Sequence, residues 1–443
     1  MHLDVDKSTE LSIFWFRRDL RLNDNAALFE ALKNNNSVLP LFIFDTEILE
    51  KLPSKEDKRI VFIHHHIAKL QTELIKLGSS LLVMHGSPMA VFEKLVSNFT
   101  ISSVYANTDY EPETIARDHN IFNLLKNKGI AFKLFKDQVI FEKSEIIKNN
   151  GTPFQVFTPY SKAWKNKLKE NKTPLFSSEK LLNNFYKTSP FPIPTLTEIG
   201  FKNTEIINSE PIIDQNIIRT YDETRNFPYL KGTSNLSVHL RFGTISIRKL
   251  VNLALELNEP FLIELIWREF FMMILYHHPR VANECYKKQY NYIAWRNNEE
   301  EFKKWCSGET GYPIVDAGMR ELNETGFMHN RVRMIVASFL TKHLLIDWRW
   351  GEAYFAEKLL DYELSSNNGN WQWSAGCGCD AAPYFRIFNP YEQIKKFDSN
   401  LTYTKKWVKN LKTPDYPTPI VEHTFARERF LKIFKTSLNN AVK

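Results

Sequence analysis

Between residues 11 and 140 the chain alternates short apolar runs with amphipathic stretches, and this alternation restricts the fold more than any other feature. Runs this apolar are typical of strands buried on both faces, as in a parallel sheet covered by crossover helices. We therefore expect a doubly wound, Rossmann-like parallel α/β domain. The runs are 11–16, 37–45, 80–86, 103–107 and 131–140, and the helical stretches lie near 24–33, 57–77, 88–98 and 113–128.

This region lacks the glycine-rich loops that commonly hold nucleotide phosphates. Neither GxGxxG nor GxxxxGK[ST] occurs, and Gly78, Gly86 and Gly129 are isolated. The usual signatures of NAD(P) dehydrogenases and P-loop ATPases are therefore missing.

After the α/β region the chain passes through a proline-rich stretch into a helical half. Residues 151–230 hold eight of the 20 prolines, which is typical of a long surface connection with a few short helices. From about 236 to 432 apolar residues repeat at three-to-four spacing, as in helices. We predict an α/β domain over 1–145, a linker over 146–220, an all-helical domain over 221–432 and a frayed tail over 433–443.

Composition narrows the class of protein. A net charge of +7 permits a nucleic-acid partner without demanding one. Four cysteines among 443 residues are too few for a disulfide framework, which favours a reducing cytosol. The polar N-terminus is not typical of a secretory signal, and the apolar runs are shorter than a membrane span. We therefore expect a cytoplasmic protein.

Aromatic residues concentrate in the second half of the chain. Eight of the ten tryptophans follow residue 260. This distribution indicates either a large aromatic core or a site for a planar cofactor, for stacked bases or for electron transfer.

Two polar segments in the helical half are candidate sites. Residues 231–235, Lys-Gly-Thr-Ser-Asn, precede a helix pattern at 236–242. Such a segment can hold a pyrophosphate at the helix start or simply cap the helix. Residues 361–390 open with Asp361 and Glu363 and continue with clustered polar residues beside apolar helices. Because buried polar groups need partners, this density indicates a site.

Neither the cysteines nor the histidines form a convincing metal motif. Cys377 and Cys379 lack a second pair of ligands, and zinc usually takes four. The consecutive His64, His65 and His66 would point about 100° apart on a helix. We expect no metal site.

The segment 325–339 places an amide, a thioether and two arginines within about one helical turn, at Asn330, Met334, Arg331 and Arg333. Arg333 can pair with Asp361, and Arg331 can face a phosphate. The alternative is that both are ordinary arginines of a helix surface.

Several blocks of the chain resemble the photolyase/cryptochrome flavoproteins. Within that family the chain is most similar to the class I cyclobutane pyrimidine dimer photolyases. The similarity runs from about residue 11 to 410, with the blocks in order. They are LSIFWFRRDLRLNDNAAL (11–28), KGTSNLS (231–237), ELIWREF (264–270), TGYPIVDAGMREL (310–322), MHNRVRM (328–334), LLIDWR (344–349) and NNGNWQWSAG (367–376).

The resemblance implies a U-shaped FAD held by the helical domain. Positions matching the contacts to the phosphates and ribitol are Tyr221, Thr233, Ser234, Asn235, Leu236 and Ser237. Positions matching those near the flavin ring and adenine are Asn330, Arg333, Asp361 and Glu363. Asn367 matches the residue opposite flavin N5 and is a neutral amide, as in photolyases. The chain departs from the usual Gly-Gly of this block with Gly369-Asn370.

The resemblance also implies a pocket for UV-damaged DNA, with a pyrimidine dimer flipped out of the duplex. Glu264 matches a hydrogen-bond donor to a thymine carbonyl, and Trp267 and Trp373 match residues that stack on or flank the dimer. Asn330, Arg331 and Met334 would complete that wall. Arg225 and Arg331 match phosphate contacts. Glu264, Asn330, Met334 and Asn367 are accordingly the predicted catalytic residues.

Trp371, Trp348 and Trp295 match the tryptophan chain that reduces photoexcited flavin in the family. A second, light-harvesting chromophore is common in the family, either methenyltetrahydrofolate or 8-hydroxydeazaflavin. Glu111 resembles a folate contact, and the choice between folate, deazaflavin and no antenna stays open.

The predicted function is a light-driven DNA lyase that splits cyclobutane pyrimidine dimers by electron transfer from excited reduced FAD, acting as a monomer. One alternative is a blue-light photosensor of the cryptochrome type, and a further one is a DNA-binding flavoprotein without catalysis. A (6-4) photolyase is disfavoured because Asn330 and Met334 stand where that subfamily has histidines.

Overall fold

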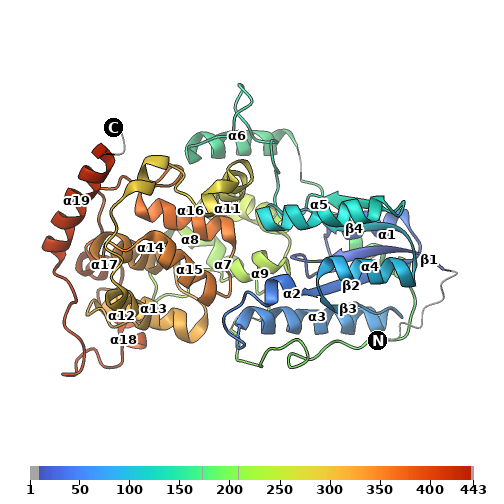
Figure 1. Cartoon of the computed structure of the whole chain (residues 1–443), viewed down its shortest axis with the longest axis horizontal. Coiled ribbons are helices and arrows are strands. Elements are labelled where there is room, and N and C mark those ends of the chain that lie inside the picture. The colour runs from blue at the N-terminus through green and yellow to red at the C-terminus, as the bar shows by residue number, and fades with distance from the viewer. Residues whose placement is uncertain (1–8, 172, 208, 441–443) are drawn as a thin grey trace. The chain divides into compact units, whose positions relative to one another are not determined.

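The computed structural model describes residues 9–171, 173–207 and 209–440 (Figure 1). Within these residues five parallel strands form a sheet in the order β3-β2-β1-β4-β5. The strands are β1 (Glu10–Phe16), β2 (Val38–Asp45), β3 (Leu82–Gly86), β4 (Thr100–Asn107) and β5 (Ala131–Phe135). The predicted doubly wound sheet is confirmed, and the buried pattern of β1 and β2 explains their unbroken apolar runs.

Helices connect the strands of the sheet. They are α1 (Ala26–Asn34), α2 (Thr46–Leu49), α3 (Lys58–Lys76), α4 (Pro88–Asn98) and α5 (Pro112–Lys126). The side chains of Asn25, Asp57 and Ser87 accept hydrogen bonds from the first turns of α1, α3 and α4. Ile13 of β1 lies beside Leu39 of β2, and alternate β1 residues pack with apolar side chains of α4 and α5.

The predicted strand over 131–140 is too long, because β5 ends at Phe135. Asp137 lies just beyond it, almost fully buried. Its carboxylate accepts hydrogen bonds from Arg21 Nη2 at 2.7 Å and from Arg248 Nη2 at 2.8 Å. The chain leaves the sheet here so that this buried carboxylate can reach two guanidinium groups.

By their internal contacts the described residues divide into two units. Unit 1 consists of residues up to 142, 167–212 and 236–253, and unit 2 of 143–166, 213–235 and 254 onward. These units differ from the predicted boundaries, since 143–166 joins the helical unit and 236–253 joins the sheet. Arg248 explains the second difference: its Nε lies 3.0 Å from an Asp24 carboxylate oxygen of unit 1.

Unit 2 is built from helices around an aromatic core. Its long central helix is α11 (Glu259–His277), whose eleven buried residues include Phe270 and Phe271. Those that carry the candidate site are α14 (Asn330–Ser338), α15 (Trp348–Lys358) and α16 (Leu364–Ala375). The others are α7 (Gln215–Arg219), α8 (Tyr221–Thr224), α12 (Glu299–Ser307), α13 (Pro313–Thr325), α17 (Pro390–Phe397), α18 (Thr402–Trp407) and α19 (His423–Asn440), with η3 (Pro279–Ala282), η4 (Lys288–Tyr292) and the π-helical turn η5 (Phe339–His343).

Helices also occur in the predicted linker and at the C-terminal end. The linker carries α6 (Phe157–Glu170), longer than the short helices expected, and the turns η1 (Ser178–Lys180) and η2 (Leu182–Asn184). α9 (Ser237–Phe242) and α10 (Ile247–Leu257) follow. The predicted frayed tail is wrong for 433–440, which complete α19 because Phe430 and Phe434 are fully buried. Residues 1–8 and 441–443 lie outside the described residues.

Among the residues that the structure describes, no helix combines the length and apolarity that crossing a membrane would require.

Replacing Arg248 by methionine should destabilise unit 1, because it leaves the buried Asp24 and Asp137 carboxylates short of a positive partner. We expect the free energy of unfolding to fall by about 3–5 kcal/mol, measured by urea denaturation. Lys249→Met, at the exposed neighbouring position, is the matched control and should stay within about 0.5 kcal/mol of wild type. Equal losses in both variants would contradict the role of the buried cluster.

Candidate functional site

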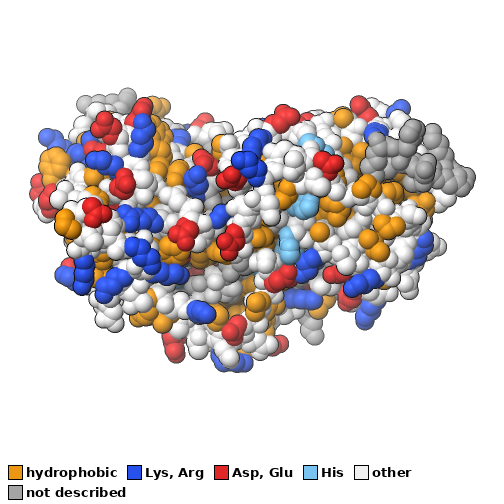
Figure 2. Space-filling view, turned by 90° about the horizontal axis from the view of Figure 1, so that it is seen from below, with side chains coloured by type: hydrophobic (Ala, Val, Ile, Leu, Met, Phe, Trp, Pro, Cys, Tyr) orange, Lys and Arg blue, Asp and Glu red, His pale blue; other side chains and the backbone are white. Residues whose placement is uncertain are grey.

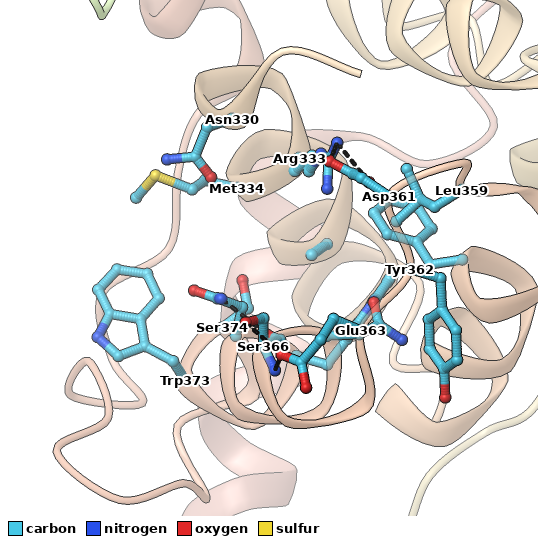
Figure 3. Close-up of a pocket in the computed structure, with 15 residues that line it drawn as sticks. Asn330, Arg333, Met334, Leu359, Asp361, Tyr362, Glu363, Ser366, Trp373 and Ser374 are labelled. Atoms are coloured by element: carbon cyan, nitrogen blue, oxygen red, sulfur yellow. Dashed lines mark hydrogen bonds and ion pairs between the residues drawn. The ribbon is translucent and has the colours of Figure 1, made fainter. Parts of the chain in front are cut away.

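A pocket with about 600 Å³ of unfilled space, part of it open to solvent, lies in unit 2 between α14, the end of α15 and α16 (Figure 3). Its lining combines ionic, amide and aromatic side chains, a mixture suited to a flat polar heterocycle. The predicted site residues among its lining are Asn330, Arg333, Met334, Asp361, Glu363, Asn367, Trp371 and Trp373. The structure thus brings together residues that lie up to 43 positions apart in the sequence.

Arg333 and Asp361 form an ion pair at one side of the pocket (Figure 3). Arg333 Nη2 lies 2.9 Å from Asp361 Oδ2, and Arg333 Nε donates to the backbone oxygen of Met328 at 2.7 Å. The predicted pairing is confirmed. The pair offers adjacent donors and acceptors, which can match the alternating C=O and N–H groups of a heterocycle edge.

Glu363 is the N-cap of α16 and is buried. Its carboxylate accepts hydrogen bonds from the backbone N–H of Ser366 at 3.0 Å and from the hydroxyls of Ser365 and Ser366, both at 2.7 Å. A carboxylate at this end also complements the helix dipole. Glu363 therefore holds the first turn of α16 in place beneath the pocket.

Asn367, one turn further along α16, donates its side-chain amide to Glu352 of α15. Asn367 Nδ2 lies 3.0 Å from the backbone oxygen of Glu352 and 2.9 Å from its Oε1. Both amide hydrogens are thus committed to Glu352, which leaves the Asn367 carbonyl oxygen as the group available to the pocket. Burial raises the pKa of Glu352 to about 7, against a smaller lowering by the Asn367 hydrogen bond.

The sequence analysis did not identify Glu352 as a site residue. It lies in an amphipathic helix stretch, GEAYFAEKLLD, where a carboxylate is usually solvated. Only the packing of α15 against α16 reveals its partner.

Close packing of α15 on α16 depends on Gly351. A Cβ atom there would fall 2.1 Å from the ring of Trp371 and 2.5 Å from Leu340. Gly369 of α16 is equally restricted, since a Cβ would lie 2.2 Å from the ring of Phe271 in α11. The chain thus keeps glycine at position 369, where the packing requires it, and departs from the usual Gly-Gly only at Asn370.

Asn330, Met334 and Trp373 border the pocket at the left of Figure 3. Asn330 and Met334 come from α14 and Trp373 from α16. Asn330 is exposed and the other two are half-buried, so these groups are accessible to a ligand. Their mixture of amide, thioether and indole suits a neutral base better than an ion.

Glu264, Arg225 and Tyr221 form a cluster elsewhere in unit 2. Arg225 Nη1 lies 2.5 Å from Glu264 Oε1, and the guanidinium lies 5.5 Å from the centre of the Tyr221 ring. Burial raises the pKa of Glu264, and the charge of Arg225 opposes that shift. Arg225, the predicted phosphate contact, is thus paired with Glu264, the predicted lesion contact.

Trp267 and Arg331 are each held by an aromatic ring. Trp267 of α11 stacks on Phe157 of α6, with the ring centres 3.6 Å apart and the planes 5° from parallel. The Arg331 guanidinium lies 4.4 Å from the centre of the Phe397 ring, and its Nη2 donates to Asn226 Oδ1 at 2.6 Å.

Trp371, Trp348 and Trp295 belong to the same aromatic core of unit 2. Trp371 and Trp348 are buried and Trp295 is half-buried, as expected for a path that ends at the surface. The Trp371 ring meets Phe355 with ring centres 5.0 Å apart and Trp305 with ring centres 6.1 Å apart. Trp305 was not among the predicted electron-transfer residues.

The predicted phosphate-binding residues lie outside the pocket lining. Tyr221, Thr233, Ser234, Asn235, Leu236 and Ser237 are all described, and none lines the pocket. Asn235 adopts a left-handed backbone with φ of 53°, just before α9 begins at Ser237. Their assignment to a phosphate or ribitol contact stays a prediction.

In unit 1, Glu111 is held by two arginines. Its Oε1 accepts hydrogen bonds from Arg18 Nη1 and Arg241 Nη1, both at 2.9 Å. A second, light-harvesting chromophore at this unit stays a prediction, with folate and deazaflavin both open.

The fold and the pocket define a two-part protein with a parallel-sheet unit and a helical unit that can hold a flat heterocycle. Residues 12–178 match the family described as DNA photolyase, and residues 261–414 match the FAD binding domain of DNA photolyase. A deoxyribodipyrimidine photo-lyase of Synechococcus sp. is 37% identical, over 95% of this chain and 96% of its own length.

Two solved structures share the fold over nearly the whole chain. A bacterial class III photolyase from Agrobacterium tumefaciens superposes with a TM-score of 0.86 at 31% identity, covering 99% of both chains. An archaeal photolyase from Sulfolobus tokodaii with two FAD molecules gives 0.78 at 34% identity, covering 97% of this chain and all of its own.

The chain belongs to the photolyase/cryptochrome family and carries its FAD binding domain. The residues present fit the cofactor. The Arg333–Asp361 pair, the oriented amide of Asn367 and the ring of Trp371 supply the polar and stacking groups that an isoalloxazine ring needs.

The raised pKa of Glu352 gives the stability of the protein a definite pH dependence. The folded protein binds this proton more tightly than the unfolded chain, whose pKa is near 4.5. The stabilising effect is therefore complete below about pH 4.5 and is lost as the pH rises through about 7. Glu352→Gln removes this titration and should flatten the fall of the melting temperature between about pH 5 and 8.

The melting temperature would be followed by circular dichroism across that pH range. Glu357→Gln, in the same helix, is the matched control and should keep the wild-type profile. A profile for Glu352→Gln that superposes on wild type would contradict the assignment.

Proposed function

We propose that the protein is a light-driven deoxyribodipyrimidine photo-lyase that splits cyclobutane pyrimidine dimers in UV-damaged DNA. The observation that carries this proposal is the pocket in which Asn367, Arg333 and Asp361 lie beside Asn330, Met334 and Trp373. Asn367, Arg333 and Asp361 suit a flavin. Asn330, Met334 and Trp373 border the same pocket with groups suited to a neutral base. The similarity to relatives named deoxyribodipyrimidine photo-lyase and photolyase supports the same activity.

FAD, when bound and reduced, supplies the photoexcited electron that splits the cyclobutane ring. The residues of this chain bind, orient and shield it. Arg333 and Asp361 hold the polar edge of the ring system. Asn367 presents its carbonyl oxygen because Glu352 takes both amide hydrogens. Glu363 holds these groups in place by capping α16.

The lesion wall consists of Glu264, Trp267, Asn330, Met334 and Trp373, with Arg225 and Arg331 for the flanking phosphates. Base flipping is an established property of photolyases, and damaged bases cost less to unstack. The Arg225–Glu264 pair suggests how DNA acts on this wall. A phosphate that takes Arg225 leaves Glu264 without its cation, and burial then favours its protonated form, which can donate to a thymine carbonyl.

The charge of the protein suits this partner. Figure 2 shows lysine and arginine side chains gathered at the left of one face, over unit 2. Binding to DNA should therefore weaken as the salt concentration rises. We place the protein in the cytoplasm and expect it to act as a monomer.

Light-dependent repair tests the proposal. FAD-loaded, reduced protein is mixed with an oligonucleotide that carries one thymine cyclobutane dimer, illuminated with blue light and compared with a dark sample by chromatography. We expect thymines to be restored only in the light. If illuminated samples with bound, reduced FAD yield no thymine, the proposal fails, and the (6-4) lesion and a photosensor role become the next hypotheses.

Trp371→Phe tests the electron path that we propose through Trp371, Trp348 and Trp295. Phenylalanine is much harder to oxidise than tryptophan, so photoreduction of bound oxidised FAD should slow by about tenfold or more, while repair by chemically reduced enzyme continues. Photoreduction would be followed by absorbance under blue light. Trp407→Phe, a half-buried tryptophan with no proposed role, should behave as wild type. Wild-type photoreduction in Trp371→Phe would show that electrons take another route.

A further inference from the structure

Phe157 lies in α6, in a segment that the sequence analysis treated as linker. The structure assigns residues 143–166 to the helical unit, so that Phe157 packs in the same unit as α11 and α16. The segment is therefore part of the helical unit rather than a connection between units.

One face of Trp267 is covered by Phe157. The ring centres are 3.6 Å apart and the planes are 5° from parallel. Phe270 meets both rings edge-on, at 5.6 Å from Trp267 and 5.7 Å from Phe157. Trp267 therefore cannot change rotamer without losing both its stacking contact with Phe157 and its edge contact with Phe270.

Trp267 is linked through Phe271 to α16, the helix that carries Asn367. Trp267 contacts Phe271 one turn along α11, with ring centres 5.5 Å apart. Phe271 in turn packs against Gly369 of α16, where a Cβ would fall 2.2 Å from its ring. A continuous column of contacts therefore runs from Phe157 through Trp267 and Phe271 to α16.

Phe157 is itself anchored by the chain that follows α16. Its backbone N–H donates to Asp380 Oδ2 at 3.0 Å, and the Cys379 thiol donates to the backbone oxygen of Gln155 at 2.9 Å. Asp380 adopts a left-handed backbone with φ of 51°, a conformation that costs free energy for a residue other than glycine. The turn after α16 thus holds α6 at its first residue.

We propose that Phe157 is a positioning residue that fixes the plane of Trp267 for stacking on the extruded dimer. This inference rests on the proposed function, because it gives Trp267 its role in lesion binding. Preorganising an aromatic wall reduces the ordering cost when a ligand binds. The Asp380 contact further ties Phe157 to the segment that follows α16, the helix that carries Asn367 and Trp373.

Phe157→Leu removes the flat ring while keeping most of the buried apolar volume. The full-length, FAD-loaded protein would be titrated with a fluorescent oligonucleotide carrying one thymine cyclobutane dimer, and with the same oligonucleotide undamaged. We expect affinity for the damaged oligonucleotide to fall about three- to tenfold, with affinity for the undamaged one unchanged. In repair assays KM for the dimer should rise while kcat stays near wild type.

The chain offers a matched control and a rescue. Phe154 lies in the same segment and contacts Tyr160 edge-on at 6.1 Å, so Phe154→Leu should bind both oligonucleotides as wild type does. Phe157→Tyr keeps the ring and should restore dimer affinity. If Phe157→Leu does not accumulate as folded protein, Asp380→Ala, which removes the anchor of the Phe157 N–H, should lower dimer affinity in the same selective way, by about two- to fivefold.

Three results would overturn the inference. Unchanged dimer affinity in Phe157→Leu, when wild type repairs, would show that Trp267 needs no support from this ring. Equal losses for damaged and undamaged DNA, or loss of FAD, would show a merely structural role. Failure of wild type itself to repair the dimer in the light would overturn the proposed function and this inference together.

Discussion

The contact between α15 and α16 at Gly351 is the constraint from which the candidate site follows. With no Cβ at this position the helix approaches the Trp371 ring closely enough for Glu352 to reach Asn367. That approach commits the Asn367 amide hydrogens to α15 and leaves its oxygen to the pocket. It also buries Trp371 beside the pocket, where an electron donor to a bound flavin would need to lie.

Carboxylates that are shielded from solvent have different partners in the two units. In unit 1, Asp24 and Asp137 are neutralised by Arg21 and Arg248, which holds 236–253 against the sheet. At the candidate site the Glu352 carboxylate is instead hydrogen-bonded to the neutral Asn367 amide, and desolvation raises its pKa. Carboxylates with raised pKa values are concentrated at functional sites, which agrees with the position of the half-buried Glu352 beside the pocket-lining Asn367.

The sequence predicted the parallel sheet from its apolar runs, which fit strands such as β1 and β2 that are buried on both faces. It offered the Arg333–Asp361 pair because an arginine and a carboxylate stand in the two candidate segments 325–339 and 361–390. It did not predict Glu352, which looks like a solvated helix residue, or Phe157, whose partner Trp267 lies 110 positions away in a different helix. Nor did it place the end of β5 at Phe135, two residues before Asp137 forms a buried ion pair with the distant Arg248. Contacts between distant segments decided each of these cases.

Equilibrium binding of FAD to the apoprotein tests this account most directly, comparing wild type with Gly351→Ala. The account predicts one FAD per chain in wild type and at least about tenfold weaker binding in Gly351→Ala, because the added methyl group pushes α15 away from Trp371 and Asn367. Gly318→Ala controls for general overpacking, because a Cβ there would lie 2.4 Å from Val332 and Gly318 does not line the pocket. This variant should lose stability with less effect on FAD affinity. Wild-type FAD affinity in Gly351→Ala would contradict the account.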